Sequence, residues 1–289
     1  MRELKILGVV LFFTLALYWG VEPFAHSQMH PHVADADFTF KDLPAQSKIG
    51  DAKQGEENFQ NAGCAGCHSL KIEGIDAPMD NATASASFGV VPPDLSNAGA
   101  IYDTNFLAAL IKNPTVALKV EHKFSETKPH PMTKFYGLGG DINQEIADIV
   151  AYLKSIAPTE KLDDKQVFAD ACARCHTLKY ENIERTSEQV PLTKYMGSTP
   201  PDLSMMIRSK GEEYLMTFIN NPQKQLKGTA MPRVGLTQEA QEQVINYLEK
   251  TGDRKKDERN ALGYKVIGFM LIFTLLAYLW KVKIWREVH

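Results

Sequence analysis

The residues best suited to chemistry lie in two short motifs with the pattern Cys-x-x-Cys-His. They are Cys64, Cys67 and His68 in the first motif and Cys172, Cys175 and His176 in the second. Two thiols at this spacing can add to the two vinyl groups of a porphyrin, and the adjacent imidazole can bind the iron. The chain has four cysteines, so the motifs leave none for a disulfide. The spacing predicts two covalently attached c-type haems, with His68 and His176 as iron ligands.

Two other chemistries use paired cysteines and stay open as alternatives. A structural zinc site can be built from two Cys-x-x-Cys pairs. A redox dithiol uses one pair, usually within a thioredoxin-like βαβ unit. The histidine that follows both pairs, and a sequence without a βαβ pattern, favour haem attachment.

Both motifs belong to a longer internal repeat with a constant shift of 108 positions. The sequence Pro-Pro-Asp-Leu-Ser occurs at residues 92–96 and again at 200–204, and Asn-Pro occurs at 113–114 and 221–222. Beyond this point the first copy carries extra residues at 121–128. A repeat of this kind indicates two halves of one fold.

Hydrophobic spacing predicts that both halves are helical. Residues 51–61 and 163–171 form helices that lead into the motifs, and residues 146–156 and 240–248 form closing helices with Asn143 and Thr237 as N-caps. Segments 79–91 and 184–200 are expected to be loops, and 157–161 a linker. Because no segment alternates as a strand does, we expect an all-α fold.

Two segments without charged residues, 6–21 and 266–280, lie near the two ends. Each is slightly shorter than the ~20 residues that span a bilayer, but flanking lysines can extend toward the surface. We expect an N-terminal membrane helix at residues 1–24, with a secretory signal peptide as the alternative. We expect a C-terminal membrane anchor at residues 260–286, with a buried core helix as the alternative.

Charge near these segments predicts their orientation. Arg2 and Lys5 precede the first segment, and Lys281, Lys283 and Arg286 follow the second. The positive-inside tendency places both groups in the cytoplasm and residues 22–262 outside. Covalent haem attachment takes place outside the cytoplasmic membrane, so we expect the haem domains to face the periplasm of a bacterium.

A second protein ligand should bind each iron on the side opposite the histidine. Met132 and Met231 are the main candidates, because each lies beside a proline just before a closing helix. A thioether ligand stabilises the ferrous state and raises the potential. The other candidates are Met79, His122 and His130 in the first copy, and Met196, Met205, Met206 and Met216 in the second.

The repeated proline loops are expected to orient the histidines. A metal-bound imidazole usually donates its other N–H to a carbonyl or carboxylate. We expect the carbonyls of Pro93 and Pro201 to accept these hydrogen bonds, and Leu95 and Leu203 to pack on the rings. The alternative is that the loops are only tight turns.

Over residues 50–250 the chain resembles tandem class I cytochrome c domains. Its second half is similar to cytochrome c1 of quinol–cytochrome c reductases in the 200–204 loop, Arg208, the Gly-Glu-Glu-Tyr sequence at 211–214, Met231-Pro232 and the C-terminal anchor. This resemblance implies that Arg208 meets a haem propionate and that Tyr214 lies near the ring. Cytochrome c1 has one haem, whereas this chain has two motifs. It is therefore similar to the di-haem cytochrome c subunit of some bacterial bc1-type complexes.

The resemblance implies an all-α fold with two tandem class I cytochrome c domains, at residues 48–157 and 160–252, between two transmembrane helices. It implies an electron-transfer subunit that is not an enzyme on its own and has no catalytic residues. Its partners would be cytochrome b, a Rieske iron–sulfur protein, a soluble cytochrome c and the membrane.

The alternatives are a di-haem peroxidase and a membrane-tethered shuttle to a terminal oxidase. A net charge of −3 without a basic run argues against nucleic acid as a partner.

Overall fold

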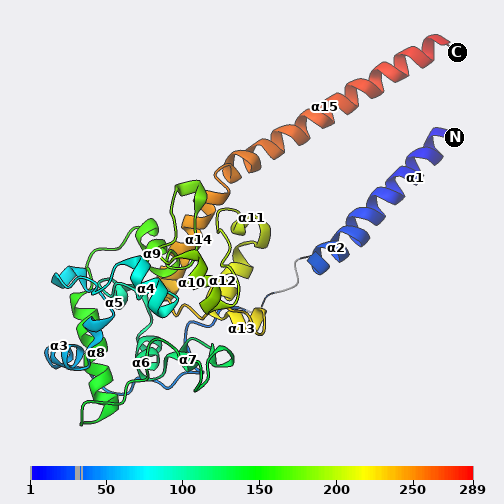
Figure 1. Cartoon of the computed structure of the whole chain (residues 1–289). Coiled ribbons are helices and arrows are strands. Elements are labelled where there is room, and N and C mark those ends of the chain that lie inside the picture. The colour runs from blue at the N-terminus through cyan, green and yellow to red at the C-terminus, as the bar shows by residue number, and fades with distance from the viewer. Residues whose placement is uncertain (1, 30–32, 34, 289) are drawn as a thin grey trace.

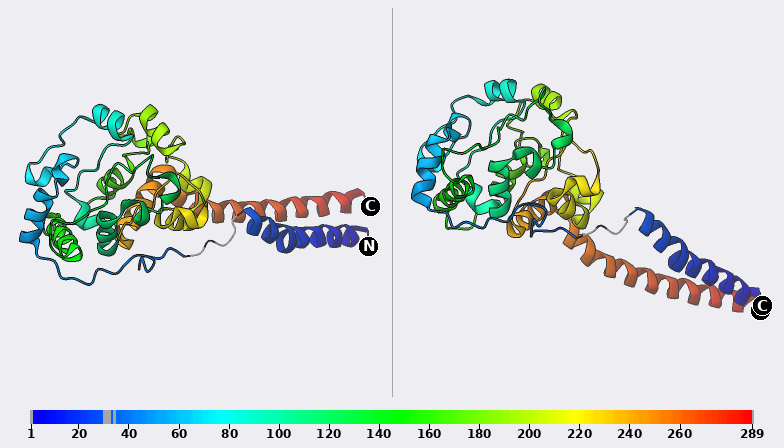
Figure 2. Two further views of the ribbon diagram at one scale, coloured as in Figure 1. Left: turned by 60° about the horizontal axis from the view of Figure 1, so that its bottom comes forward. Right: turned by 90° about the horizontal axis from the view of Figure 1, so that it is seen from below.

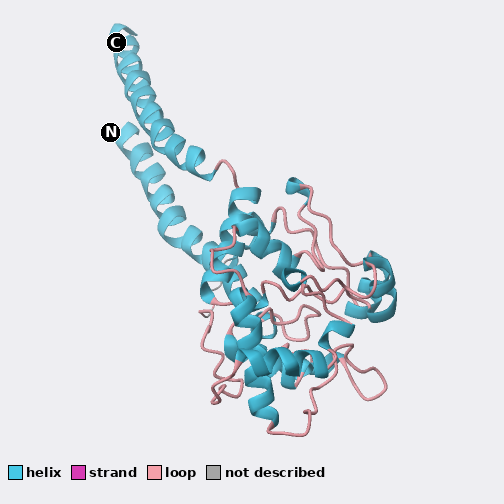
Figure 3. Ribbon diagram, turned by 90° about the vertical axis from the view of Figure 1, so that its left-hand side faces the viewer, coloured by secondary structure: helices cyan, strands magenta, loops and turns pink. Residues whose placement is uncertain are grey.

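The computed structural model describes residues 2–29, 33 and 35–288. Over these residues the chain is helical, and its β-structure consists of isolated bridges such as those joining Leu70 to Ile75 and Leu178 to Ile183 (Figure 3). The all-α fold expected from the sequence is confirmed.

The two halves of the globular part have the same helical plan (Figure 1). In the first domain, three helices pack against α8 (Ile142–Ile156): α3 (Ala52–Asn61), α5 (Ala98–Ile101) and α6 (Thr104–Lys112). In the second, three helices in the same order pack against α14 (Gln238–Gly252): α9 (Asp164–Cys172), α11 (Met206–Lys210) and α12 (Glu212–Asn220). Each half therefore brings its motif and its proline loop to one closing helix. Short helices complete the two halves: η2 (Cys64–Gly66), η3 (Lys71–Glu73), α7 (Pro114–Ala117), η4 (Glu121–Lys123), η5 (Lys179–Glu181) and α13 (Pro222–Gln225).

Side-chain caps determine where these helices begin. Thr237 Oγ1 accepts a hydrogen bond from Ala240 N, which confirms Thr237 as the N-cap of α14. The expected cap at Asn143 is wrong, because the N-cap of α8 is Asp141, whose carboxylate accepts a hydrogen bond from Asn143 N. An aspartate two residues earlier can reach a free N–H of the first turn, whereas Asn143 already lies inside the helix.

The segments predicted as loops, 79–91 and 184–200, contain helices instead. They are α4 (Asn81–Phe88) and α10 (Gln189–Met196), and they pack against each other across the two domains. Each ends at a glycine with a left-handed backbone, Gly89 (φ 81°) and Gly197 (φ 80°). Neither segment has the hydrophobic spacing of the closing helices, so the local signals for these helices are their capping residues, Asp80 at the start of α4 and the two glycines at the ends.

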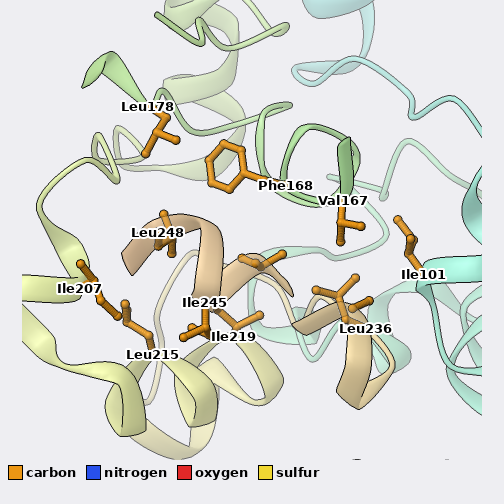
Figure 4. Packing of buried hydrophobic residues seen from close by; sticks show 12 residues of the cluster. Ile101, Val167, Phe168, Leu178, Ile207, Leu215, Ile219, Leu236, Ile245 and Leu248 are labelled. Carbon is orange, nitrogen blue, oxygen red and sulfur yellow. The ribbon is translucent and has the colours of Figure 1, made fainter. Parts of the chain in front are cut away.

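The domains also share a hydrophobic core. Ile101 of the first domain packs with Val167, Phe168 and Leu236 of the second (Figure 4). Two backbone hydrogen bonds cross at the same place: Thr237 N donates to Ile101 O at 2.9 Å, and Asp103 N donates to Gly235 O at 3.0 Å. The position of each site is thus determined by both halves of the chain.

An N-terminal strap at residues 35–49 runs along both domains (Figure 2). Phe40 and Leu43 are buried against Phe106 of the first domain. Asp42 forms an ion pair of 2.9 Å with the buried Arg233 of the second domain. The core of the first domain therefore includes residues that precede the expected boundary at 48.

Two long apolar helices leave the globular part. The first combines α1 (Arg2–Ala16), the π-helical turn η1 (Leu17–Val21) and α2 (Glu22–Met29), and the second is α15 (Lys256–Val288). By length and composition, Glu3–Gln28 and Lys256–Arg286 could each cross a membrane. The termini of both lie at the same end (Figures 1 and 2), where Lys281 Nζ is 2.5 Å from Glu3 Oε2. The expected apolar helices at both ends are confirmed.

Candidate functional sites at the two motifs

Each motif histidine is held by one carbonyl. His68 Nδ1 lies 2.9 Å from Pro93 O, and His176 Nδ1 lies 2.8 Å from Pro201 O. A carbonyl oxygen only accepts hydrogen bonds, so Nδ1 must carry the proton and Nε2 keeps its lone pair. Burial is the main cause that lowers the pKa of both imidazoles, which favours the neutral form that a metal binds. Both histidines are therefore in the tautomer that an iron ligand requires.

The motif turns are alike in the two domains. His68 N donates to Cys64 O and His176 N donates to Cys172 O, both at 3.0 Å. Burial raises the pKa of Cys64 to about 11 and that of Cys172 to about 12. A redox dithiol needs a thiol with a lowered pKa, so these cysteines do not fit that alternative.

Asp94 and Asp202 join the proline loops to the motifs by hydrogen bonds, and the sequence analysis does not predict this role. Ser69 Oγ donates to Asp94 Oδ2 at 2.8 Å, and Thr177 Oγ1 donates to Asp202 Oδ2 at 2.7 Å. Burial raises the pKa of both carboxyls, but hydrogen bonds from hydroxyl and backbone groups outweigh it and hold each pKa below its usual value. The signal was available in the sequence, because the aspartate of the repeated loop and a hydroxyl residue after each histidine occur in both copies.

Backbone hydrogen bonds reinforce this attachment. Leu95 N donates to Ser69 O at 2.9 Å, and Leu203 N donates to Thr177 O at 3.0 Å. The side chains of Leu95 and Leu203 are half-buried and pack against the core clusters of their own domains. Their packing on a haem ring stays a prediction.

The contacts of the methionines in the second domain narrow the choice of axial ligand. Three of the candidates have their sulfur beside a polar group: Met216 next to Gln241 Nε2 at 3.0 Å, Met206 next to Ser209 Oγ at 3.7 Å, and Met196 next to Lys123 Nζ at 3.6 Å. Met205 is 43% exposed. Met231 is half-buried and packs against the second core, as Met206 and Met216 also do. Its role as the ligand stays a prediction.

In the first domain Met132 and His130 lie together. His130 Nδ1 is 3.0 Å from Met132 O and 3.1 Å from Met132 N, and its ring packs edge-on against Phe124. The His130 imidazole is thus in hydrogen-bond contact with the backbone of Met132. His122 lies elsewhere, in a surface hollow with Asp42 and Val116, whereas Met79 is half-buried in the segment before α4.

Arg208 and Tyr214 lie on neighbouring helices of the second domain. Arg208 is exposed on α11, and its charge helps Arg259 to lower the pKa of Asp253 at the end of α14. Tyr214 stacks on Phe218 with ring centroids 5.5 Å apart. Contact of either residue with a haem stays a prediction.

Three arginines have buried nitrogen atoms without a hydrogen-bond partner among the described residues: Arg233 (Nε and Nη1), Arg174 (Nε) and Arg185 (Nη1). Arg233 is ion-paired with Asp42 through its other nitrogen, whereas Arg174 and Arg185 belong to the second motif and the segment that follows it. Buried polar groups are normally hydrogen-bonded, so these guanidinium groups fit an anionic group that lies outside the polypeptide. The propionates of a haem are such groups, and the motif histidines supply the ligand atom. The residues of both sites therefore fit haem.

Two helical domains, each with a paired-thiol turn and a histidine held by a proline carbonyl, define a tandem c-type cytochrome. The family model of cytochrome c matches residues 52–157 and 164–252, and the chain belongs to the cytochrome c family. Members of this family bind haem c covalently. A chain in a structure titled "Hyperthermophilic respiratory Complex III" is similar over 100% of this chain and 98% of that chain, with 21% identity and a TM-score of 0.34. That likeness is too distant to bear on the function.

Proposed function

We propose that this chain is the di-haem cytochrome c subunit of a bacterial quinol–cytochrome c reductase of the bc1 type. It takes single electrons from a Rieske iron–sulfur protein and delivers them to a soluble cytochrome c. The observation that carries the electron-transfer role is the duplicated histidine geometry, in which Nδ1 donates to a proline carbonyl and Nε2 therefore keeps its lone pair in both domains. The resemblance of the second half to cytochrome c1 carries the assignment to this complex.

Bound haem supplies a one-electron ferric/ferrous couple at each site. Cys64 and Cys67, and Cys172 and Cys175, would hold the two porphyrins. His68 and Met132 would be the protein ligands of the first iron, and His176 and Met231 those of the second. Pro93 and Pro201 hold the imidazoles in place, and Leu95 and Leu203 would pack on the rings. Two protein ligands at each iron would leave no position for a substrate, which favours electron transfer over peroxide chemistry.

Contacts between the domains support a relay from one site to the other. Val91, two residues before Pro93, donates its N–H to Ser187 Oγ at 2.9 Å. Ser187 N in turn donates to the carbonyl oxygen of Arg174, inside the second motif, at 3.3 Å. This short series of contacts joins the loop of the first site to the turn of the second. The sites therefore belong to adjoining walls of the domains.

The position of the second domain supports its role as the entry point. α14, which packs beside the second motif, ends at Gly252, and α15 begins at Lys256. This short connection ties the second domain to the membrane helix. The second haem would receive the electron, with Arg208 and Tyr214 at its edge as in cytochrome c1, and the first haem would pass it to the soluble acceptor. Acidic residues outnumber basic ones between residues 22 and 280, which favours a basic acceptor.

The arrangement of the termini supports the proposed orientation. The two chain termini lie at the same end of the apolar helices (Figure 2), and basic residues occur in both terminal segments of the sequence. The positive-inside tendency assigns that side to the cytoplasm. The domains at 48–157 and 160–252 then lie in the periplasm, held by membrane helices within residues 1–24 and 260–286.

Purification of the full chain from its own membranes in mild detergent tests the proposal. We expect a cytochrome b and a Rieske protein to co-purify with it, and quinol to reduce its haems. Co-purification with a terminal oxidase alone would replace the proposal by the tethered shuttle. A resting high-spin haem, or a low-potential haem with two histidine ligands, would replace it by the peroxidase.

A further inference from the structure

The segment at residues 229–235 carries Met231 between α13 and α14, and no part of it is helical. Within the second domain, Met231 N donates to Thr229 Oγ1 at 3.5 Å, and Val234 N donates to Ile219 O at 3.4 Å. Both distances are longer than the usual N–H···O distance of about 2.9 to 3.0 Å. These hydrogen bonds of its own domain therefore fix the segment weakly.

The first domain also binds this segment. Arg233 N donates to Leu118 O at 3.0 Å, which is shorter than the two bonds within the second domain. Lys123, which belongs to the extra residues of the first copy, donates from Nζ to Ala230 O at 3.3 Å. Ala230 directly precedes the proposed ligand and Arg233 lies two positions after it. The first domain therefore contacts the segment on both sides of the ligand in sequence.

The side chain of Arg233 adds a charged contact to the strap at residues 35–49. Arg233 is only 3% exposed, and its Nη2 lies 2.9 Å from Asp42 Oδ2. Its guanidinium carbon lies 5.5 Å from the centroid of the Phe40 ring. A buried cation that loses its partner is strongly destabilising. Removal of the Asp42 charge should therefore drive the Arg233 side chain toward water.

The strap is attached to both domains, which fixes the position of Asp42. On the side of the second domain, Asp37 N donates to Asn220 Oδ1 and Asn220 Nδ2 donates to Asp37 O, both at 3.2 Å. On the side of the first domain, Gln46 N donates to Asn105 Oδ1 at 2.9 Å. Asp42 lies between these two attachments. It can therefore act as a fixed partner for Arg233.

We propose that Asp42 and Lys123 are positioning residues of the second site: through Arg233 and the carbonyl of Ala230, they keep the Met231 thioether where it can bind the second iron. This inference rests on the proposed function, in which Met231 is the second axial ligand. Because Arg233 is two residues from Met231, a movement of Arg233 toward water displaces the thioether. The first domain and its strap thereby complete the site of the second domain.

The test compares full-length variants in detergent by haem ligation and potential. The weak far-red band of ferric haem reports the bond between iron and a thioether, and Met231→Leu identifies the band and the redox wave of the second haem. We expect Asp42→Asn to weaken the same band and to move the same wave at least tenfold toward the oxidised form, which is about 59 mV for one electron. Loss of a negative charge alone would move the wave in the opposite direction. Asp42→Glu keeps the charge and should keep most of the band.

Ser85→Ala is the matched control. Ser85 Oγ on α4 accepts a hydrogen bond of 3.0 Å from Glu188 N at the start of α10. Its loss weakens a contact between the domains that does not involve the segment at 229–235, so the band and the wave of the second haem should stay as in wild type. Equal effects of Ser85→Ala and Asp42→Asn would overturn the inference, because a general loosening of the domains would then explain both.

An unchanged band in Asp42→Asn would also overturn the inference. Lys123→Met decides the matter if Asp42→Asn binds fewer than two haems. It removes the donor to Ala230 O, so we expect a weaker band of the second haem, and an unchanged band there would overturn the inference.

The failure of the inference and the failure of the proposed function are distinguishable. If Met231→Leu alters the band and the wave but Asp42→Asn and Lys123→Met do not, only the role of the first domain is contradicted. If Met231→Leu changes neither, Met231 is not the ligand and the inference falls with it. Fewer than two haems on the wild-type chain would contradict the proposed function itself.

Discussion

His68 and Pro93 are joined by a hydrogen bond of 2.9 Å between Nδ1 and the carbonyl oxygen. The bond defines which imidazole nitrogen remains available as a ligand. The same bond recurs between His176 and Pro201 in the second domain. Around both bonds, an aspartate in the proline loop binds the hydroxyl residue that follows the histidine. These relationships lead to separate tests.

Replacement of Asp94 should weaken the first site without touching its thiols or imidazole. Asp94→Ala removes the acceptor for Ser69 Oγ and Ser96 N, and we expect a loss of about 1 to 3 kcal/mol in stability. Thermal unfolding followed at the haem absorbance measures it. Asp202→Ala is the matched change in the second domain, and a similar loss is expected there. Equal stability of Asp94→Ala and wild type would show that the loop is held by its backbone alone.

The same aspartates predict how stability depends on pH. Their pKa in the folded chain lies below the usual value of 3.8. A carboxyl with a depressed folded pKa stabilises the fold above its unfolded pKa, and this contribution is lost as the pH falls through the folded pKa. We therefore expect the stability difference between wild type and Asp94→Asn to be constant at pH 5 to 7 and to shrink below about pH 4. A difference that grows on acidification would contradict this role.

Exchange of the proposed axial ligand should change the second haem alone. Met231→His replaces a thioether by an imidazole, which stabilises ferric iron, so we expect one of the two redox waves to move to a clearly lower potential. Met216→Leu is the control, because the sulfur of Met216 lies beside Gln241 in the core. An effect of Met216→Leu larger than that of Met231→His would reassign the ligand.

Alanine variants of two glycines at helix ends can distinguish the cost of backbone strain from the cost of a clash between the domains. Gly89 and Gly197 have nearly equal φ angles of 81° and 80°. A Cβ at Gly89 would lie 2.4 Å from Tyr195 Cβ, whereas a Cβ at Gly197 would meet nothing within 4 Å. We expect Gly197→Ala to cost about 1 to 2 kcal/mol from the left-handed backbone, and Gly89→Ala to cost more. Equal unfolding midpoints for the two variants would show that α4 and α10 separate without penalty.

Local features of the chain could be predicted from the sequence, because their causes lie within a few residues. The motif turns, the closing helices and the cap at Thr237 are of this kind. The packing between the domains could not be predicted in this way. Ile101 contributes to the core of the other domain, and the extra segment at 121–128 places Lys123 Nζ 3.3 Å from Ala230 O of the second domain.

We propose that each domain holds one haem whose iron is bound by two protein ligands, which leaves no open coordination position. The most direct measurement is the number of covalently bound haems per purified chain, combined with carbon monoxide binding to the reduced native protein. We expect two haems per chain and little change of the reduced spectrum on addition of carbon monoxide. One haem per chain, or ready carbon monoxide binding by the native protein, would contradict the claim.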